Sequence, residues 1–318
     1  MLLGIEIGGT KLQLGVGGAD GKIDGLERLQ IDPARGAAGI LAQIESAIEP
    51  LLLKVGLGRG DIEGVGIGFG GPVDSASGAV IKSHQVDGWD DFPLADWFSW
   101  LLKTSRVSIE NDADTAGLAE ARIGAGAGTS PVLYVTIGSG VGGGLILDDR
   151  IYRGWGGGAT EIGHLRIGDG DDPPTLESIA SGWGIGEKAR RLVEQNIREG
   201  GTGGSMPGLA AGPTDRINAE IVARAASQGD PLSLAVLKDA THAMAIALGH
   251  ATTLLAPRTI VLGGGVSLMG EELWFEPIRR ELHRRVFGPF RGTYRLVPAS
   301  LGERVVVHGA LILAGSAA

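Results

Sequence analysis

The chain of 318 residues contains 56 glycines, 14 prolines and no cysteine. The glycines follow no Gly-X-Y period and 43% of the residues are hydrophobic, which excludes a collagen-like and a disordered protein. Without cysteine there is no disulfide, thiolate catalysis or cysteine-ligated zinc, and the formal charge of −9 argues against a nucleic-acid-binding protein. The length allows one large or two moderate domains.

The N-terminus shows no export signal, because no basic region precedes its short apolar run and Glu6 interrupts that run. Residues 240–257 are nearly long enough to span a bilayer, but they include two histidines and three threonines. We interpret this stretch as a buried core helix in which His242 and His250 have partners within the core. The protein is therefore expected to be cytoplasmic.

The first residues predict a β-hairpin. Residues 3–7 and 11–16 alternate in polarity on either side of the turn Gly8-Gly9-Thr10. The other elements predicted in this half are a helix over residues 36–55, a buried strand over 64–71 that ends in a glycine-proline turn, and a strand over 106–109 that leads into a helix ending at 124.

A second copy of the hairpin follows about 130 residues later. Residues 133–140 align with residues 3–10, and each is followed by a second strand, here 144–147. This self-similarity predicts two related α/β halves and not a solenoid. We place the linker at 124–131. The remaining predictions are a mobile surface loop over 200–213, helices from 214 to 256, a strand over 259–262, and a solvated helix face with strand flanks in the arginine-rich segment 278–304.

The two glycine turns are candidate phosphate sites. Residues 138–143 match G-x-G-x-x-G, but a strand follows instead of a helix, so the context of a dinucleotide fingerprint is missing. A glycine turn still lets backbone N–H groups approach anionic oxygens, and the hydroxyl of Thr10 or Ser139 adds a donor. Two such turns predict a polyphosphate site; the alternative is that both are ordinary hairpin turns. We expect much of the surplus glycine at strand ends of this kind, and the remainder, around 124–128 and 200–212, in a hinge and a loop.

Charged residues stand beside these turns. Glu6 is suited to hold Mg²⁺ through water and Lys11 to place a positive charge near phosphate, although either is also compatible with an exposed hairpin residue. Asn111 and Asp112 are both preferred helix N-caps, and an aspartate at a strand end can also accept a proton from a substrate hydroxyl. Asp112 is therefore a candidate base for phosphoryl transfer.

Two carboxylates and an imidazole form a third group. Glu161, His164 and Glu177 are separated only by short segments and loop-forming residues, and they offer several hydrogen-bonding groups to the hydroxyls of a sugar. A zinc site is a poor alternative, since only one histidine is present here.

Together these segments resemble the ROK family of sugar kinases over essentially the whole chain. The segments that carry the resemblance are residues 5–11, 70–74 with Gly88-Trp89, 110–114, 136–144, 161–164 with Glu177, and 261–267. The resemblance implies an actin-like ATPase (ribonuclease H-like) fold, with two related α/β domains around a cleft. It implies a small domain of residues 1–118 plus about 303–318 and a large domain of residues 119–302.

The resemblance also implies roles for individual residues, with Asp112 as the general base. The sugar contacts that it implies are Gly71, Asn111, Asp112, Glu161, His164 and Glu177. The nucleotide contacts that it implies are Glu6, Gly8, Gly9, Thr10, Lys11, Gly138, Ser139, Gly140, Gly264 and Gly265.

Three positions depart from the family pattern. Glu6 replaces the family's aspartate and is one methylene longer. The cysteine cluster that binds zinc is missing from the shortened segment 165–176, so no structural zinc is expected. His84-Gln85-Val86 stands where many members carry a sugar-contacting asparagine.

The resemblance implies an ATP-dependent hexose kinase that uses Mg²⁺, acts first on glucose and forms a homodimer, without a nucleic-acid or membrane partner. N-acetylated hexosamines, fructose and mannose are alternative acceptors, and polyphosphate is an alternative donor. A catalytically weak sugar-binding sensor is the alternative of another class, motivated by Glu6 and the missing zinc cluster. The chain resembles the kinases of the family and not its regulators, whose winged helix-turn-helix would precede the first phosphate motif.

Overall fold

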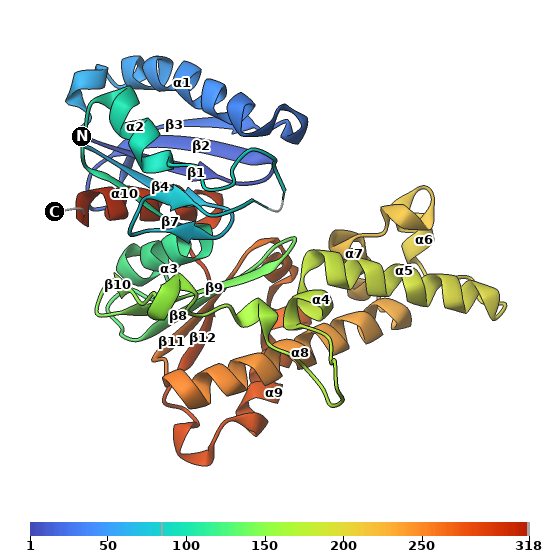
Figure 1. Ribbon diagram of the computed structural model, residues 1–318. Coiled ribbons are helices and arrows are strands. Elements are labelled where there is room, and N and C mark those ends of the chain that lie inside the picture. Colours follow the sequence, from blue (N-terminus) through green and yellow to red (C-terminus); the bar gives the residue numbers. More distant parts are fainter. Residues whose placement is uncertain (84, 317–318) are drawn as a thin grey trace. The chain divides into compact units, whose positions relative to one another are not determined.

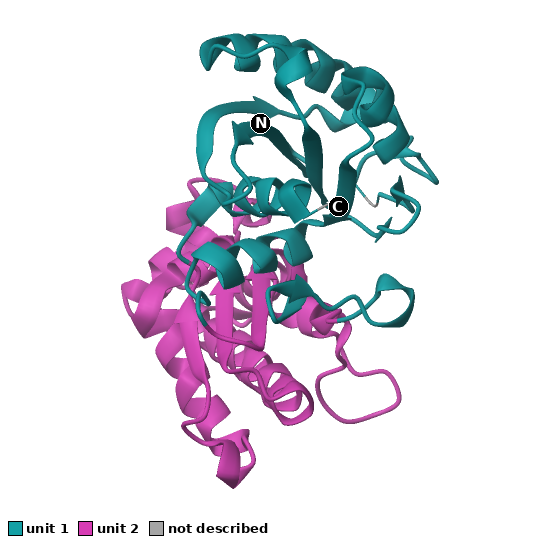
Figure 2. Ribbon diagram, turned by 90° about the vertical axis from the view of Figure 1, so that its left-hand side faces the viewer, with its two compact units in different colours: residues 1–128, 144–159, 300–318 teal, residues 129–143, 160–299 magenta. Residues whose placement is uncertain are grey.

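The computed structural model describes residues 1–83 and 85–316, which form two compact units (Figure 2). Unit 1 comprises Met1–Gly128, Gly144–Ala159 and Ser300–Ala318, and unit 2 comprises Thr129–Gly143 and Thr160–Ala299. The predicted linker, residues 124–131, contains no helix or strand.

Unit 1 is built on a mixed sheet with the strand order β3-β2-β1-β4-β7. β1 (Leu2–Ile7) and β2 (Lys11–Gly17) form the predicted hairpin, and β3 (Ile23–Gln30) adds an antiparallel edge strand. β4 (Gly64–Phe69) and β7 (Val107–Asn111) run parallel to β1. The carboxyl ends of β1, β4 and β7 therefore meet at one edge of the sheet.

Helices cover both faces of this sheet, with α1 and α2 on one face and α3 and α10 on the other (Figure 1). Their bounds are α1 Gly36–Lys54, α2 Leu94–Leu102, α3 Asp112–Ile123 and α10 Val305–Ser316. α10 contacts β1, β4 and α3. A short hairpin of β5 (Val73–Asp74) and β6 (Ala79–Val80) follows β4.

The side of the sheet that α10 covers is lined by glycine. A Cβ atom on Gly66 would lie 1.9 Å from the carbonyl oxygen of Ala310, and one on Gly309 would lie 1.9 Å from that of Thr115. Both contacts are impossible, so α10 reaches the sheet and α3 only because these side chains are absent. The other strand glycines whose Cβ would meet α10 are Gly4, Gly15, Gly17, Gly64 and Gly68. Gly4, Gly15, Gly66 and Gly68 lie inside their strands, so for these four the expectation that the surplus glycines lie at strand ends is wrong.

The second sheet repeats the order of the first, as β10-β9-β8-β11-β12. Its strands are β8 Val132–Ile137, β9 Val141–Leu147, β10 Arg150–Ile151, β11 Thr259–Gly263 and β12 Arg295–Pro298. β11 runs parallel to both β8 and β12, and β10 pairs antiparallel with β9. The strand order confirms the predicted duplication of an α/β half.

The helices of unit 2 gather around α8 (Pro231–Leu255), which contacts α4, α5, α7 and α9. The bounds of these four are α4 Leu176–Ala180, α5 Gly182–Arg198, α7 Ala219–Ser227 and α9 Glu276–Arg285. Much of α8 is buried, including Met244 and Leu248. The predicted core helix is thereby confirmed.

Two helical segments of the described chain, residues 33–54 and 231–255, are long and apolar enough to cross a membrane by length and composition. The first includes α1, which buries Ile40 and Ile44 in the core of unit 1, and the second is the core helix α8. A core helix of a globular protein meets the same criterion, so the observation is weak evidence for a membrane protein.

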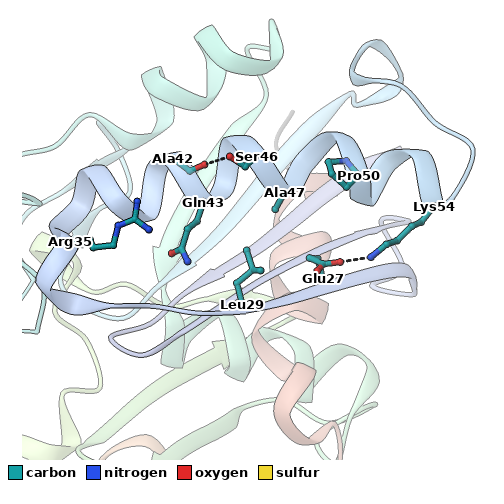
Figure 3. A pocket seen from close by; sticks show the side chains of 9 residues that line it. All are labelled: Glu27, Leu29, Arg35, Ala42, Gln43, Ser46, Ala47, Pro50 and Lys54. Carbon is teal, nitrogen blue, oxygen red and sulfur yellow. Dashed lines mark hydrogen bonds and ion pairs between the residues drawn. The ribbon is translucent and has the colours of Figure 1, made fainter.

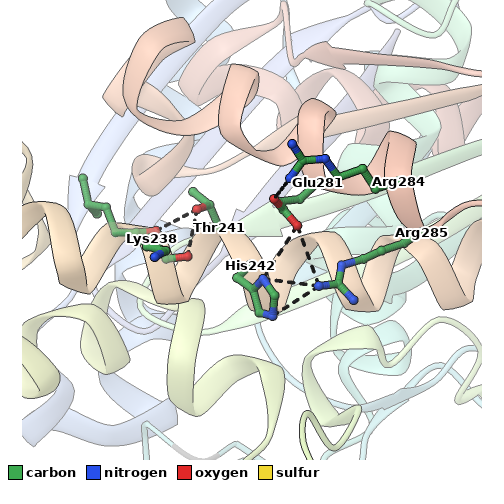
Figure 4. Close-up of polar contacts among 7 residues, drawn as sticks. Lys238, Thr241, His242, Glu281, Arg284 and Arg285 are labelled. Carbon is green, nitrogen blue, oxygen red and sulfur yellow. Dashed lines mark hydrogen bonds and ion pairs between the residues drawn. The ribbon is translucent and has the colours of Figure 1, made fainter.

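The prediction that His242 and His250 are core residues is wrong, because both are exposed on the outer stripe of α8. His242 lies beside α9, with its ring 3.3 Å from a guanidinium nitrogen of Arg285 and 3.9 Å from the Glu281 carboxylate (Figure 4). Glu281 also pairs with Arg284 at 2.8 Å. Arg284 and Arg285 are thus paired with Glu281. Both are exposed, like Arg280 and His283 of the same helix, which confirms the predicted solvated helix face.

The predicted surface loop 200–213 contains a short helix, α6 (Met206–Ala210). Met206 is fully buried in the core of unit 2, so the segment is anchored at its centre. Pro207 lies in the first turn, where a missing N–H costs no helical hydrogen bond.

Candidate active site

The carboxyl ends of three parallel strands in unit 1 bring together Gly8, Gly70 and Asp112, which directly follow β1, β4 and β7. Gly70 N–H donates to Ile7 O at 2.8 Å. A Cβ atom on Gly70 would lie 3.3 Å from Gly8 Cα and 3.4 Å from Asp112 Oδ2. The Asp112 carboxylate therefore lies beside the first glycine turn.

The first glycine turn is closed by a hydrogen bond from Gly8 N–H to Lys11 O at 2.9 Å. Thr10 at its tip is exposed. The side chain of Gln85 lies so close to Gly9 that a Cβ atom there would be 1.5 Å from Gln85 Oε1. A larger residue at position 9 would therefore require the side chain of Gln85 to move. His84, the neighbouring residue in the departure from the family pattern, lies outside the described residues.

Glu6 is a buried carboxylate with two partners, the ammonium group of Lys11 and the side-chain amide of Gln13. It is 7% exposed, and its Oε1 lies 2.8 Å from Lys11 Nζ, while Oε2 accepts a hydrogen bond from Gln13 Nε2. Gln13 Nε2 also donates to Glu303 O at 2.8 Å. Burial raises the pKa of Glu6, and the charge of Lys11 and the hydrogen bonds oppose this shift. For Glu6 the alternative of an exposed hairpin residue is therefore wrong.

The pKa of Asp112 is raised to about 6, chiefly by burial and next by the negative charge of Glu6. A hydrogen bond from Ala113 N–H and the charge of Lys11 act in the opposite direction. A carboxylate with such a pKa is ionised at neutral pH and is still basic enough to accept a proton.

Asn111 performs the capping, because its Oδ1 accepts from Ala113 N–H at 2.8 Å at the start of α3. Its amide Nδ2 donates to Gly71 O at 3.1 Å and so ties the glycine-proline turn to the end of β7. Asp112 is thus available for a role other than capping.

The second glycine turn lies in unit 2, between β8 and β9. Gly138 N–H donates to Gly140 O at 2.9 Å, and Gly138 O accepts from Gly182 N–H at 2.7 Å. Glu177 Oε2 accepts from Val141 N–H at 2.9 Å. A Cβ on Gly140 would lie 2.5 Å from the same oxygen. Glu177, expected at the sugar, therefore also supports this turn.

Glu161 and His164 lie on one tight turn, in which His164 N–H donates to Glu161 O at 3.1 Å, and both residues are exposed. The loop that follows is closed at its base by Leu176 N–H, which donates to Leu165 O at 2.8 Å. His164 and Glu177 directly flank this pair. The structure therefore brings the backbones of His164 and Glu177 together. That the side chains of Glu161, His164 and Glu177 converge on a sugar stays a prediction.

A cavity of about 570 Å³ in unit 2 is lined by three of the predicted nucleotide residues, Gly138, Ser139 and Gly265. Sequence reasoning missed Trp183, Glu220 and Leu268, which line the same cavity. Trp183 is 72% and Leu268 85% exposed. Two large apolar side chains left this exposed beside one cavity suit a flat apolar ligand.

Gly264, beside this cavity, adopts a φ of +83°, and a Cβ there would lie 2.4 Å from Ile137 O. Glycine is therefore required at this position, for both backbone conformation and space. Another hollow, of about 400 Å³, lies in unit 1 between α1 and β3, and includes Arg35, Gln43 and the ion pair of Lys54 with Glu27 (Figure 3). None of the predicted site residues lines it.

Within the described part of the chain, no group of three or more His, Asp or Glu side chains could hold a metal ion by itself. Glu6 and Asp112 form a pair of carboxylates whose negative charges are close enough to interact. Such a pair fits Mg²⁺ held partly through water and partly by substrate phosphates, the usual coordination of this ion.

Comparison with known proteins places these features in a family. The model of the ROK family matches residues 2–317. A glucokinase of Thermotoga maritima is 30% identical over 318 residues, which cover 97% of this chain and 95% of that protein.

Solved structures agree with this match. A ROK family glucokinase from Streptomyces griseus, in complex with glucose and AMPPNP, is 31% identical with a TM-score of 0.80 and covers 98% of both chains. A ROK hexokinase from Thermus thermophilus is 25% identical with a TM-score of 0.79, covering 98% of this chain and 97% of its own. These similarities confirm the predicted actin-like ATPase fold class.

Proposed function

Because the chain belongs to the ROK family, we propose that it is a hexose kinase that transfers the γ-phosphoryl group of ATP to a sugar hydroxyl, as a glucokinase does. The observation that carries the proposal is Asp112, a carboxylate with a pKa of about 6 beside a glycine turn at the ends of three parallel strands. Phosphoryl transfer requires such a base, together with positioning and neutralisation of charge.

In this reaction Asp112 accepts the proton of the sugar hydroxyl as its oxygen attacks the γ-phosphorus, and ADP leaves with the bridging oxygen. Asn111, Gly71, Glu161, His164 and Glu177 would contact the other hydroxyls of the sugar and orient it. Orientation of this kind lowers the barrier because the entropy of alignment is lost on binding and not in the reaction.

The two glycine turns would hold the phosphates through backbone N–H groups. Gly8, Gly9 and Thr10 form the first turn, with Lys11 supplying positive charge. The second turn is formed by Gly138, Ser139 and Gly140. Mg²⁺, held by Glu6 through water, would neutralise charge on the phosphates.

The nucleoside of ATP would occupy the cavity of unit 2. Gly264 and Gly265 form one wall, and Trp183 and Leu268 offer apolar surfaces for the base. Glu220, also at this cavity, offers oxygens to hydroxyl groups of the ribose. The glucokinase from Streptomyces griseus, whose complex contains glucose and AMPPNP, supports the same pair of substrates here.

Glucose is the proposed acceptor, with N-acetylated hexosamines and fructose as alternatives. We also propose a cytoplasmic location and a homodimer, by analogy with the family.

The test is ADP release with Mg-ATP across a panel of these sugars, for the wild type and Asp112→Asn, with sugar binding measured by calorimetry. We expect turnover with at least one hexose and a loss of about 10²–10⁴-fold in kcat for the variant. Sugar binding without turnover would favour a sensor and contradict the kinase. Full activity of Asp112→Asn would contradict the assignment of the base.

A further inference from the structure

Glu110 is a buried carboxylate that the reaction described above does not use. It directly precedes Asn111 and Asp112 at the end of β7 and is 3% exposed. Its Oε2 accepts from Ser75 Oγ at 2.7 Å, and its Oε1 accepts from Arg153 Nε at 2.8 Å. A second guanidinium nitrogen of Arg153 contacts the same Oε1. The carboxylate of Glu110 thus accepts from the hydroxyl of Ser75 and from two nitrogens of the Arg153 guanidinium group.

The two partners of Glu110 belong to different loops of unit 1. Ser75 lies between β5 and β6, in the hairpin that follows the glycine-proline turn. Asn111, the next residue of β7, holds Gly71 O in that turn with its own side chain. Successive residues of β7 therefore fasten both ends of the segment that runs from Gly71 to Ser75.

Arg153 stands at the base of a glycine loop. Its carbonyl oxygen accepts from Ala159 N–H at 3.1 Å, which closes residues 154–158 into a loop of four glycines and the fully exposed Trp155. A Cβ atom on Gly157 would lie 4.0 Å from Val73 O, so the loop passes beside β5. A loop so rich in glycine has little stiffness of its own, and the guanidinium group is a fixed point at its base.

We propose that the Glu110–Arg153 ion pair positions the acceptor side of the active site, and this inference rests on the proposed kinase function. The pair fixes the end of β7, and with it the proton acceptor Asp112 and the sugar contact Asn111. It also fixes the loop from which the chain continues to Glu161, the next candidate sugar contact. Glu110 and Arg153 are positioning residues, since each acts through the residues that it holds.

The chemistry of the pair suits this role. A carboxylate buried without a partner is strongly unfavourable, and an arginine that engages it through two nitrogens restrains direction as well as distance. Lysine supplies the charge without the planar geometry. A displacement of about 1 Å at a reacting group can cost about 100-fold in rate, so a loosened β7 end has a measurable effect.

The test compares Arg153→Met and Arg153→Lys with Arg122→Met. Arg122 is a matched control, because it is also an arginine of unit 1 that fastens a loop, donating to Asp149 O at 3.0 Å. It lies in the last turn of α3, at the opposite end of that helix from Asn111 and Asp112. For Arg153→Met we expect the hexose KM to rise and kcat to fall by about 10-fold or more, with the ATP KM changed less than about twofold. Arg153→Lys should recover part of the loss, and Arg122→Met should keep both constants. Hexose KM and kcat equal to those of the wild type would overturn the inference.

A double variant covers the case in which Arg153→Met does not fold. Arg153→Met/Glu110→Gln removes the buried charge together with its partner, so it should fold and still show the raised hexose KM. Wild-type constants in the folded double variant would overturn the inference. If the wild type phosphorylates no hexose, the proposed function fails by itself, and calorimetry of sugar binding then decides: weaker binding by Arg153→Met supports the positioning role, and equal binding contradicts it.

Discussion

Glu6 and Asp112 lie close enough for each charge to matter to the other. The negative charge of Glu6 is the second cause, after burial, that raises the pKa of Asp112 to about 6, and Lys11 acts against it. As a base, Asp112 works only when it is ionised. We therefore expect kcat/KM to fall below about pH 6 as Asp112 becomes protonated. The midpoint of this acid limb gives the pKa of Asp112 in the free enzyme.

Glu6→Gln should move this acid limb to lower pH. The substitution removes the repulsion from Glu6, and it also leaves the charge of Lys11 uncompensated, so both changes lower the pKa of Asp112. The measurement is kcat/KM from pH 4.5 to 8.5. Glu303→Gln is the control, because Glu303 influences the pKa of Glu6 but is no cause of the Asp112 shift. If the acid limb of kcat/KM lies at the same pH in Glu6→Gln as in the wild type, the charge of Glu6 does not influence the pKa of Asp112.

Asp112 also sets a pH dependence of stability. Since its pKa rises from 3.8 to about 6 on folding, the folded protein holds the proton more tightly, and stability is lost as pH rises through this interval. One pKa unit corresponds to about 1.4 kcal/mol, so ionised Asp112 costs up to about 3 kcal/mol at pH 8. Asp112→Asn should therefore be more stable than the wild type at pH 8 and equally stable near pH 3.5. Urea unfolding at both pH values measures this difference. If Asp112→Asn were less stable than the wild type at pH 8, burial of the ionised Asp112 carboxylate would not destabilise the fold.

At the scale of elements, the packing of α10 on its sheet depends on glycine. Gly66→Ala would place a Cβ atom 1.9 Å from the backbone oxygen of Ala310, which no side-chain rotation relieves. We expect a loss of about 3 kcal/mol or more in the free energy of unfolding, the upper range for overpacking. Gly60→Ala is the control, since nothing lies within 4 Å of a Cβ there, and it should change stability by less than about 0.5 kcal/mol. Equal stability of both variants would show that α10 can shift at little cost.

The cavity of unit 2 offers a direct optical test. Trp183 at the start of α5 is 72% exposed beside the cavity, and Trp100 on α2 is 73% exposed in unit 1. ADP should quench the fluorescence of Trp183, and Trp183→Leu should weaken ADP binding by about 10-fold, which is within the range for loss of one stacking contact. Trp100→Leu should keep both the quenching and the affinity. Quenching that survives in Trp183→Leu would place the base elsewhere.

Strands whose residues alternate in polarity and helices with long apolar stretches could be predicted from the sequence. Elements whose conformation depends on the elements packed against them could not. The hairpin of β1 and β2 was predicted because its residues alternate, whereas β3 carries Glu27 and Gln30 on an edge strand and gives no such pattern. The error at His242 and His250 has a physical cause. Both lie on the narrow solvent stripe of α8, which is hidden when the hydropathy of the whole helix is averaged.

The candidate site could be predicted in part. Its backbone elements are strand ends and glycine turns, which the sequence pattern indicates. The grouping of Gly8, Gly70 and Asp112 could therefore be predicted from the ends of the strands that precede them. Trp183 and Leu268 were missed, because they are separated by 85 positions in sequence and only the fold brings them to one cavity. The ion pair of Glu110 with Arg153 was also missed, because only the fold brings these two residues together.

At the scale of the whole molecule, one carboxylate holds the chain near two crossings between the units. The chain first passes from unit 1 to unit 2 after Gly128, and its last return to unit 1 is at Ser300. Glu120, fully buried in unit 1, accepts from Ala125 N–H at 2.7 Å, Ser300 N–H at 2.8 Å and Leu301 N–H at 2.9 Å. Bonds from amides to an ionised acceptor are among the stronger ones in proteins.

Glu120→Gln keeps the shape of this side chain but turns an amide NH₂ toward backbone donors, which leaves at least one of these N–H groups without its acceptor. We expect a loss of about 2–4 kcal/mol in urea unfolding, whereas Ser300→Ala, which loses only the hydroxyl bond to Glu120, should lose about 0.5–1.5 kcal/mol. Release of Ala125 should also expose the glycine-rich linker 124–131, so limited proteolysis followed by mass spectrometry should find faster cleavage there in Glu120→Gln alone. If both variants lose the same stability and are cleaved at the wild-type rate, the linker is held by its other contacts, and Glu120 is an ordinary buried acceptor.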